Sequence, residues 1–200
     1  MIDTSFRKML PKYTVPLIHI YKFLNLSPNF ISILGLLLGL GSAYLISCHE
    51  FSWAIVIWWV GRLMDGTDGI YARAIGKTSS FGAYLDISCD MAAYSAIIVA
   101  FDFAFPVYHL NWNLILFLYI LCITGALSLG NLEHKSQKSN LDNRGLRLAA
   151  GFAEGGETGI AYTLFLLFPT WIGILSNLWI LVLSMTVLSR VMLAEREFKS

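Results

Sequence analysis

The chain has 200 residues, of which 56% are hydrophobic and 14% are charged, and its formal net charge is +1. Because average soluble domains carry about 25% charged residues, this composition excludes an ordinary soluble protein and indicates an integral membrane protein. We expect membrane lipids among its partners and no nucleic acid.

Residues 2–23 form a broken amphipathic segment. Apolar residues recur there every three to four positions, with basic residues mostly between them. Pro11 and Pro16 prevent one continuous helix, because proline lacks the amide proton that an inner turn needs. We expect residues 1–25 to form an interfacial amphipathic helix on the anionic cytoplasmic leaflet, with a disordered tail as the alternative. The pattern of a cleavable signal peptide is missing, so the first span is expected to stay in the mature protein.

The remaining residues, 26–200, contain six apolar runs of about 20 residues, the length that an α-helix needs to cross a bilayer. They cover residues 29–48, 53–74, 79–105, 112–131, 148–168 and 171–193. We therefore expect an all-α integral membrane protein with six transmembrane helices after the interfacial helix. Residues 1–200 are predicted to form a single membrane domain.

The basic residues predict the topology. All of them except Arg62 and Arg73 fall at the termini or in the loops after the second and fourth spans. They are Arg7, Lys8, Lys12, Lys22, Lys77, Lys135, Lys138, Arg144, Arg147, Arg190, Arg196 and Lys199. Because Lys and Arg collect in cytoplasmic loops, we expect both termini in the cytoplasm. The protein is predicted to be a multi-pass membrane protein.

The first span has clear start and packing signals. Ser27 can cap the helix, and Pro28 can occupy its first turn. Gly35 and Gly39 form a G-x-x-x-G pattern, which permits the close approach of a second helix.

Four carboxylates interrupt the second and third spans. A single Asp at the centre of a membrane helix costs roughly 2.5–3.5 kcal/mol on insertion scales, so a group of them indicates a functional site. Asp65 and Asp68 are three residues apart and Asp86 and Asp90 four apart, so each pair shares one helix face. Two helices facing each other through these pairs would form an oxygen-only, anionic pocket. Such a pocket suits Mg²⁺ or Mn²⁺ and not zinc, and its location implies an active site that faces the cytoplasm.

Small residues and basic residues accompany the carboxylates. Gly69, Ala72 and Gly82 have little or no side chain, so a large ligand could lie against the backbone beside them. Arg73 can fork two hydrogen bonds to phosphate oxygens. Arg62 and Lys77 either bind a second anion or balance the local charge.

The loop after the fourth span and the start of the fifth span hold further polar residues. Lys135 and Arg144 lie in a predicted cytoplasmic loop, which could also bind an anionic headgroup or a lipid phosphate. Glu154 and Glu157 are three residues apart and share a helix face inside an apolar segment. They either are solvated at the membrane boundary or face the pocket between the spans, where they would help to orient a substrate alcohol or a basic residue.

The carboxylate region resembles the CDP-alcohol phosphotransferase family. The family signature D-x2-D-G-x2-A-R-x8-G-x3-D-x3-D is matched without departure at Asp65, Asp68, Gly69, Ala72, Arg73, Gly82, Asp86 and Asp90. The start of the first span is similar to the family's P-N-x-x-T-x-x-G element, with Ser32 in place of the threonine. Residues 151–158 resemble an E-G-T-E-T element of a bacterial branch, with Gly156 in place of the threonine. The resemblance covers roughly residues 26–168, and its bacterial branch implies a location in a bacterial inner membrane.

This resemblance implies a phospholipid-synthesising enzyme. It would move a substituted phosphate, here a phosphatidyl group, from a CDP-alcohol such as CDP-diacylglycerol to a hydroxyl and release CMP. The resemblance gives Asp65, Asp68 and Asp86 as ligands of two Mg²⁺ or Mn²⁺ ions, with Asp90 near the metals and acting as the general base. It implies a nucleotide and diphosphate site at Asn29, Gly69, Ala72, Arg73 and Gly82, although Asn29 could instead only cap its helix.

Several alternatives stay open. The acceptor would be a small polar alcohol, but Met91 stands where glycerol-phosphate and inositol-phosphate types are expected to carry a basic residue. Transfer of a CDP-choline or CDP-ethanolamine headgroup to diacylglycerol is a second possibility. A different class is a transporter of divalent cations or polar solutes, which would need a polar path to both surfaces. A structural scaffold would leave the carboxylates unexplained. Family resemblance also suggests a homodimer.

Overall fold

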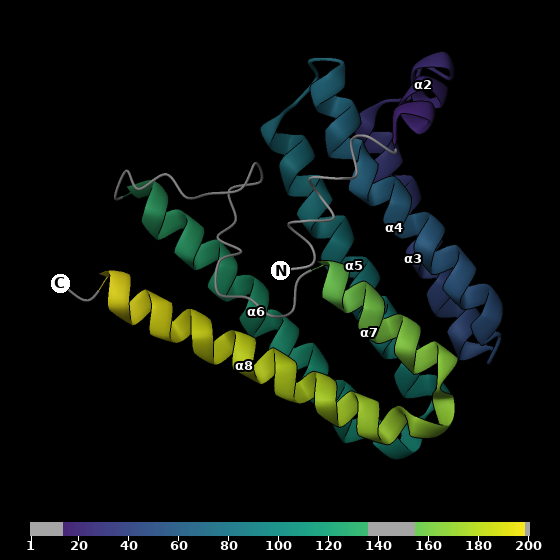
Figure 1. Cartoon of the computed structure of the whole chain (residues 1–200), viewed down its shortest axis with the longest axis vertical. Helices are drawn as coiled ribbons and strands as arrows, with labels where there is room; N and C mark the ends of the chain where they lie inside the picture. Colours follow the sequence, from purple (N-terminus) through teal and green to yellow (C-terminus); the bar gives the residue numbers. More distant parts are fainter. Residues whose placement is uncertain (1–13, 136–154, 199–200) are drawn as a thin grey trace. The chain divides into compact units, whose positions relative to one another are not determined.

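The computed structural model describes residues 14–135 and 155–198 (Figure 1). Within these ranges the chain is helical and contains no strand, which confirms the prediction of an all-α protein. The chain divides into two compact units, Met1–Pro106 and Val107–Ser200.

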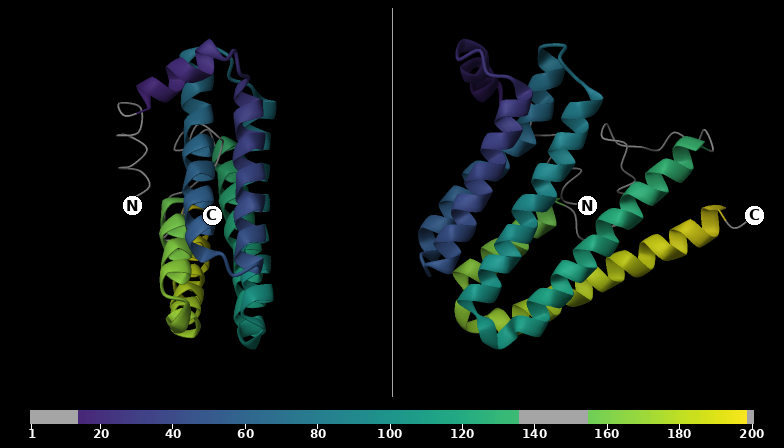
Figure 2. Two further views of the ribbon diagram at one scale, coloured as in Figure 1. Left: turned by 90° about the vertical axis from the view of Figure 1, so that its right-hand side faces the viewer. Right: turned by 180° about the vertical axis from the view of Figure 1, so that it is seen from behind.

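The first unit contains a short helix and three long ones. They are α2 (Val15–Phe23), α3 (Pro28–Ser47), α4 (Phe51–Ala74) and α5 (Ser80–Ala104). The long helix α3 packs against both α4 and α5, as the views in Figure 2 show. Two helix starts are capped by serine: Ser27 Oγ accepts the amide of Phe30 at 3.2 Å, and Ser79 Oγ accepts the amide of Gly82 at 3.0 Å. The predicted start signal at Ser27 and Pro28 is therefore confirmed.

Small residues bring these helices close together. A Cβ atom on Gly61 would lie 3.1 Å from the carbonyl oxygen of Gly35, so α3 and α4 touch backbone to backbone. A Cβ atom on Gly39 would lie only 2.9 Å from Cβ of Ala93, which shows the same closeness between α3 and α5. The G-x-x-x-G pattern of Gly35 and Gly39 therefore permits close helix approach as predicted.

Helix α2 docks on α4. Pro16 lies in the first turn of α2, where a missing amide proton costs nothing. Tyr21 is 2% exposed and packs edge to face on Tyr71 of α4, with ring centroids 5.5 Å apart. The chain turns after α2 at Asn25, whose φ of 50° is the left-handed conformation that asparagine tolerates.

The second unit contains the remaining helices. They are η1 (Pro106–Tyr108, which begins at the last residue of the first unit), α6 (His109–Lys135), α7 (Gly155–Leu167), η2 (Pro169–Trp171) and α8 (Ile172–Phe198). Helix α6 packs along α8, and α7 packs on α8. The buried hydroxyl of Tyr119 on α6 accepts hydrogen bonds from Tyr162 of α7 at 2.9 Å and from Nε1 of Trp179 on α8 at 3.0 Å. This polar contact ties the three helices together at one point.

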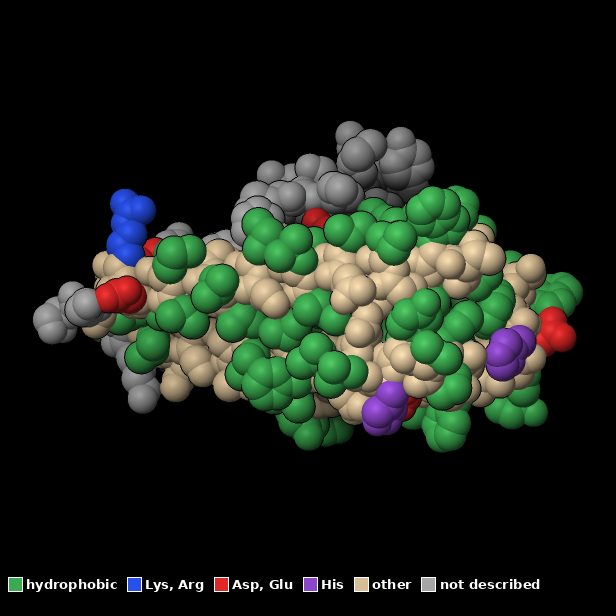
Figure 3. Space-filling model, turned by 90° about the horizontal axis from the view of Figure 1, so that it is seen from below, with side chains coloured by type: hydrophobic (Ala, Val, Ile, Leu, Met, Phe, Trp, Pro, Cys, Tyr) green, Lys and Arg blue, Asp and Glu red, His purple; other side chains and the backbone are tan. Residues whose placement is uncertain are grey.

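Four stretches of the described residues are long and apolar enough to cross a membrane. They are Pro28–Ser47, Ser80–Ala104, Pro106–Leu132 and Pro169–Phe198. The face in Figure 3 exposes mainly hydrophobic side chains, as expected of a surface in contact with lipid. The chain is therefore a multi-pass membrane protein. Helix α4 carries the charged cluster and the described part of α7 has 13 residues, so the count of six spans stays a prediction.

Candidate metal centre

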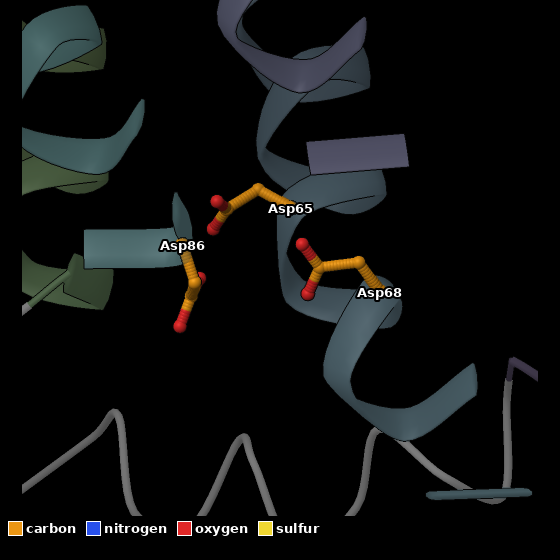
Figure 4. A group of neighbouring side chains, drawn as sticks. All are labelled: Asp65, Asp68 and Asp86. Atoms are coloured by element: carbon orange, nitrogen blue, oxygen red, sulfur yellow. The ribbon is translucent and has the colours of Figure 1, made fainter. Parts of the chain in front are cut away.

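Three carboxylates from two helices meet in the first unit. Asp65 and Asp68 lie one turn apart on α4, and Asp86 lies on α5. One ligand oxygen from each lies within 4.8 Å of the other two, and the side chains extend toward one another (Figure 4). The predicted convergence of the second and third spans through their acidic faces is present for these three residues.

Asp68 is held by two hydrogen-bond donors. It is 5% exposed, and the hydroxyl of Ser32 on α3 donates a hydrogen bond to its Oδ2. The backbone amide of Gly69 donates to its Oδ1. Both oxygens are thus oriented by donors, and a third helix contributes to the centre through Ser32.

Arg62 forms ion pairs with one carboxylate of the group, Asp65, and with the fourth carboxylate, Asp90. Its guanidinium nitrogens lie 2.8 Å from Oδ2 of Asp65 and 2.5 Å from Oδ1 of Asp90. The same guanidinium packs over the rings of Trp58 and Tyr94, at 5.7 and 5.0 Å from their centroids. Asp90 is therefore paired with the same guanidinium as Asp65, but it is not one of the three carboxylates that meet within 4.8 Å, and its role as a metal ligand stays a prediction. Of the two readings of Arg62, the ion pairs favour charge balance.

The chemistry of the centre fits a divalent cation. Its ligands are carboxylate oxygens, and the described group contains no histidine or cysteine. Arg62 can neutralise only part of the charge of Asp65, Asp68, Asp86 and Asp90. Hard cations such as Mg²⁺ and Mn²⁺ prefer this kind of ligand set.

The predicted nucleotide-site residues surround the same region. A Cβ atom on Gly69 would lie 3.4 Å from Nη1 of Arg73, so the guanidinium reaches back along α4 over the glycine. A Cβ atom on Gly82 would lie 3.4 Å from Oδ1 of Asn29, so the start of α5 lies against the start of α3. Ala72 is buried. A nucleotide-binding role for these residues stays a prediction.

The predicted acceptor residues belong to the part of the chain after residue 107. Glu157 lies in the first turn of α7, and its Oε2 is buried without a hydrogen-bond partner among the described residues. Lys135 ends α6, and its side chain lies outside the described part of the structure. Arg144 and Glu154 also lie outside the described residues.

Sequence reasoning missed the supporting residues. Ser32 was noted only as a substitution within a motif, and its contact with Asp68 depends on how α3 is rotated against α4. Tyr21 bonds to Thr67, the residue before Asp68, at 3.1 Å, and no local pattern indicates this pair of residues 46 positions apart. The one available signal was the spacing of three between Arg62 and Asp65, which places both on one helix face.

Comparison with known proteins agrees with this geometry. The family model described as CDP-alcohol phosphatidyltransferase matches residues 25–188. The inner membrane protein YnjF of Escherichia coli (strain K12) is 28% identical over 170 residues, which cover 84% of this chain and 82% of that protein. Archaetidylinositol phosphate synthase of Pyrococcus horikoshii is 36% identical over 94 residues, which cover 46% of this chain and only 50% of that protein.

Solved structures share the fold. The Mycobacterium tuberculosis phosphatidylinositol phosphate synthase PgsA1 with CDP-DAG bound matches with a TM-score of 0.66 at 20% identity, covering 90% of this chain and 92% of that chain. The same enzyme in complex with manganese and citrate matches with a TM-score of 0.63 at 21% identity, covering 90% and 87%. Because the family model covers most of the sequence, including all four aspartates, this chain belongs to the CDP-alcohol phosphatidyltransferase family.

Proposed function

We propose that this protein transfers a phosphatidyl group from CDP-diacylglycerol to the hydroxyl of a small polar alcohol and releases CMP. The observation that carries the proposal is the meeting of Asp65, Asp68 and Asp86 from two helices within 4.8 Å. The likeness to PgsA1, which has been solved with CDP-DAG bound, supports CDP-diacylglycerol as the donor.

The carboxylates would hold Mg²⁺ or Mn²⁺, and we propose two ions. Asp65, Asp68 and Asp86 are the proposed ligands, and Asp90 completes the set. Bound there, the ions would spread the negative charge of the diphosphate and of the leaving CMP. The donors from Ser32 and Gly69 fix Asp68 before any cation binds, which lowers the cost of ordering the site.

The nucleotide and diphosphate are proposed to lie beside Asn29, Gly69, Ala72, Arg73 and Gly82. Because Gly69 has no side chain, the Arg73 guanidinium lies along α4 within one turn of Asp68. A guanidinium in that place can donate two hydrogen bonds to phosphate oxygens. Asn29 and Gly82 bring the starts of α3 and α5 together, and we propose that the cytidine binds at this junction.

Asp90 is the proposed general base. The acceptor hydroxyl gives its proton to the Asp90 carboxylate, and its oxygen forms a bond to the phosphorus that carries diacylglycerol. The bond from that phosphorus to the oxygen of CMP then breaks, and CMP leaves with the electron pair. The Arg62 guanidinium lies 2.5 Å from Oδ1 of Asp90 and can orient this carboxylate for the transfer.

We propose that residues 1–200 act as one membrane domain with six spans, with α2 as an interfacial helix and the carboxylates toward the cytoplasm. The interfacial placement of α2 is supported by the exposed side chains of Ile20 and Phe23 in the helix and of Leu24 directly after it. A homodimer is also proposed, by family resemblance. For the acceptor, we propose a small polar alcohol such as serine, glycerol 3-phosphate or an inositol compound. Glu157, Lys135, Arg144 and Glu154 are its candidate contacts.

The proposal is tested by CMP release. Purified protein is incubated with radiolabelled CDP-diacylglycerol, Mn²⁺ and a panel of acceptor alcohols, and both CMP and the lipid product are measured. We expect release that needs Mn²⁺ and one class of acceptor, and that falls by at least about 100-fold in Asp68→Asn or Asp86→Asn. The reverse reaction should regenerate CDP-lipid from CMP, which a transporter would not do. Equal release by wild type and Asp68→Asn would contradict the proposal.

A further inference from the structure

A hydrogen bond fastens α2 to the turn of α4 that carries Asp68. The hydroxyl of Tyr21 lies 3.1 Å from Oγ1 of Thr67, and Thr67 directly precedes Asp68 in the chain. Thr67 is fully buried and Tyr21 is 2% exposed, so water does not compete for this bond.

The direction of the bond follows from the other contacts of Thr67. Its Oγ1 lies 2.9 Å from the carbonyl oxygens of both Leu63 and Met64, so the single hydroxyl proton of Thr67 goes to the backbone of α4. Tyr21 is therefore the donor and Thr67 the acceptor. Burial, together with the nearby negative charge of Asp68, raises the pKa of Tyr21, so the phenol keeps the proton that it donates.

A second contact holds the next turn of α4. The hydroxyl of Tyr71 donates to the backbone carbonyl oxygen of Leu26 at 3.1 Å and lies 3.4 Å from the backbone carbonyl oxygen of Tyr21. In the chain, Asp68 therefore lies between Thr67, whose side chain bonds to Tyr21 of α2, and Tyr71, whose hydroxyl bonds to the turn after α2. On its other side the Asp68 carboxylate accepts the hydroxyl of Ser32. The contacts of Thr67 and Tyr71 fix the α4 backbone on both sides of Asp68, and Ser32 of α3 orients its carboxylate.

We propose that Tyr21 and Thr67 are positioning residues, through which the docked helix α2 holds Asp68 where it can bind a divalent cation. The inference rests on the proposed function, because it assumes that Asp68 is a metal ligand. It goes beyond the four aspartates by giving α2 a role in metal affinity. A purely structural bond would affect the stability of the fold and leave metal binding unchanged.

The test compares variants that remove or keep one hydroxyl. Tyr21→Phe and Thr67→Val each remove the bond with little change of shape, and Thr67→Ser keeps a hydroxyl. Tyr162→Phe is the matched control, because Tyr162 is a buried tyrosine that also donates to a hydroxyl but lies in the second unit. For each purified protein, Mn²⁺ binding is measured by electron paramagnetic resonance of free Mn²⁺. The Mn²⁺ dependence of CMP release and the melting temperature are measured in parallel.

We expect Tyr21→Phe and Thr67→Val to weaken Mn²⁺ binding by about three- to tenfold, with an equal rise in the Mn²⁺ concentration for half-maximal CMP release. The KM for CDP-diacylglycerol at saturating Mn²⁺ should stay unchanged. The double variant should be no weaker than either single one, because both remove the same bond. Thr67→Ser should bind as wild type does, and Tyr162→Phe should lower only the melting temperature.

Wild-type Mn²⁺ affinity in a folded Tyr21→Phe protein would overturn the inference, even if that variant melts at a lower temperature. The proposed function would stand in that case, provided that Asp68→Asn still abolishes Mn²⁺ binding. If Asp68→Asn binds Mn²⁺ as wild type does, the proposed function fails and the inference fails with it.

Discussion

Arg62 pairs with two of the four acids. Its guanidinium forms ion pairs with Asp65 and Asp90, and Asp90 is not among the three carboxylates that meet within 4.8 Å. The rings of Trp58 and Tyr94 hold the guanidinium in this place through cation–π contacts. Asp90 therefore differs from the other three aspartates in its contacts, which agrees with an additional role for Asp90 as the base.

At this scale we predict that Asp90→Asn keeps nucleotide binding and loses turnover. An amide cannot take a proton from the acceptor, so kcat should fall by about 100- to 10,000-fold. Asp102→Asn on the same helix is the matched control, because Asp102 lies three turns beyond Asp90 and should keep its turnover. Measurement of kcat beside CMP binding separates the two effects. Near-normal CMP release by Asp90→Asn would remove Asp90 as the base.

The boundaries of α3, α4 and α5 were predictable from hydrophobic runs, whereas α6 extends three to four residues beyond each end of the predicted span 112–131 and α8 extends five residues beyond the predicted end at 193. The expected spans 29–48, 53–74 and 79–105 correspond to α3, α4 and α5, each start and end within two residues. The start of α3 was predictable because Ser27 and Pro28 are local signals. The contact of Ser32 with Asp68 and the two ion pairs of Arg62 were not, since they depend on how each helix is rotated against its neighbour. Helix α4 is not among the four stretches that are apolar enough to cross a membrane, because charged residues such as Arg62, Asp65 and Asp68 interrupt it, so the predicted count of six spans stays a prediction.

At the scale of elements, we predict that Gly39→Ala weakens the packing of α3 on α5. The added Cβ would lie 2.9 Å from Cβ of Ala93, so the helices must separate at a cost of about 1–3 kcal/mol. Gly41→Ala is the control on the same helix, because its Cβ would meet Ile57 at an ordinary 3.8 Å. Thermal unfolding in detergent should show a lower melting temperature for Gly39→Ala alone. Equal melting temperatures for Gly39→Ala and Gly41→Ala would show that the close approach of α3 and α5 at Gly39 does not contribute to stability.

Across the whole molecule, the two units hold different parts of the proposed chemistry. The aspartates and every predicted nucleotide-site residue belong to Met1–Pro106, and the candidate acceptor residues belong to Val107–Ser200. The signature was recognisable from sequence because its residues lie within 26 consecutive positions, from Asp65 to Asp90. The candidate acceptor residues occupy a stretch of similar length, from Lys135 to Glu157, but Lys135 and Arg144 belong to no signature of fixed spacing, and residues 151–158 match the E-G-T-E-T element only in part.

The central claim is that Asp65, Asp68 and Asp86 together bind a divalent cation. Anomalous scattering from crystals of the protein grown with Mn²⁺, with data collected near the manganese absorption edge, tests it most directly. We predict a strong manganese peak bounded by these three carboxylates, and its loss in Asp86→Asn crystals. Ordered carboxylates with no peak between them, or a peak that persists in Asp86→Asn, would contradict the account.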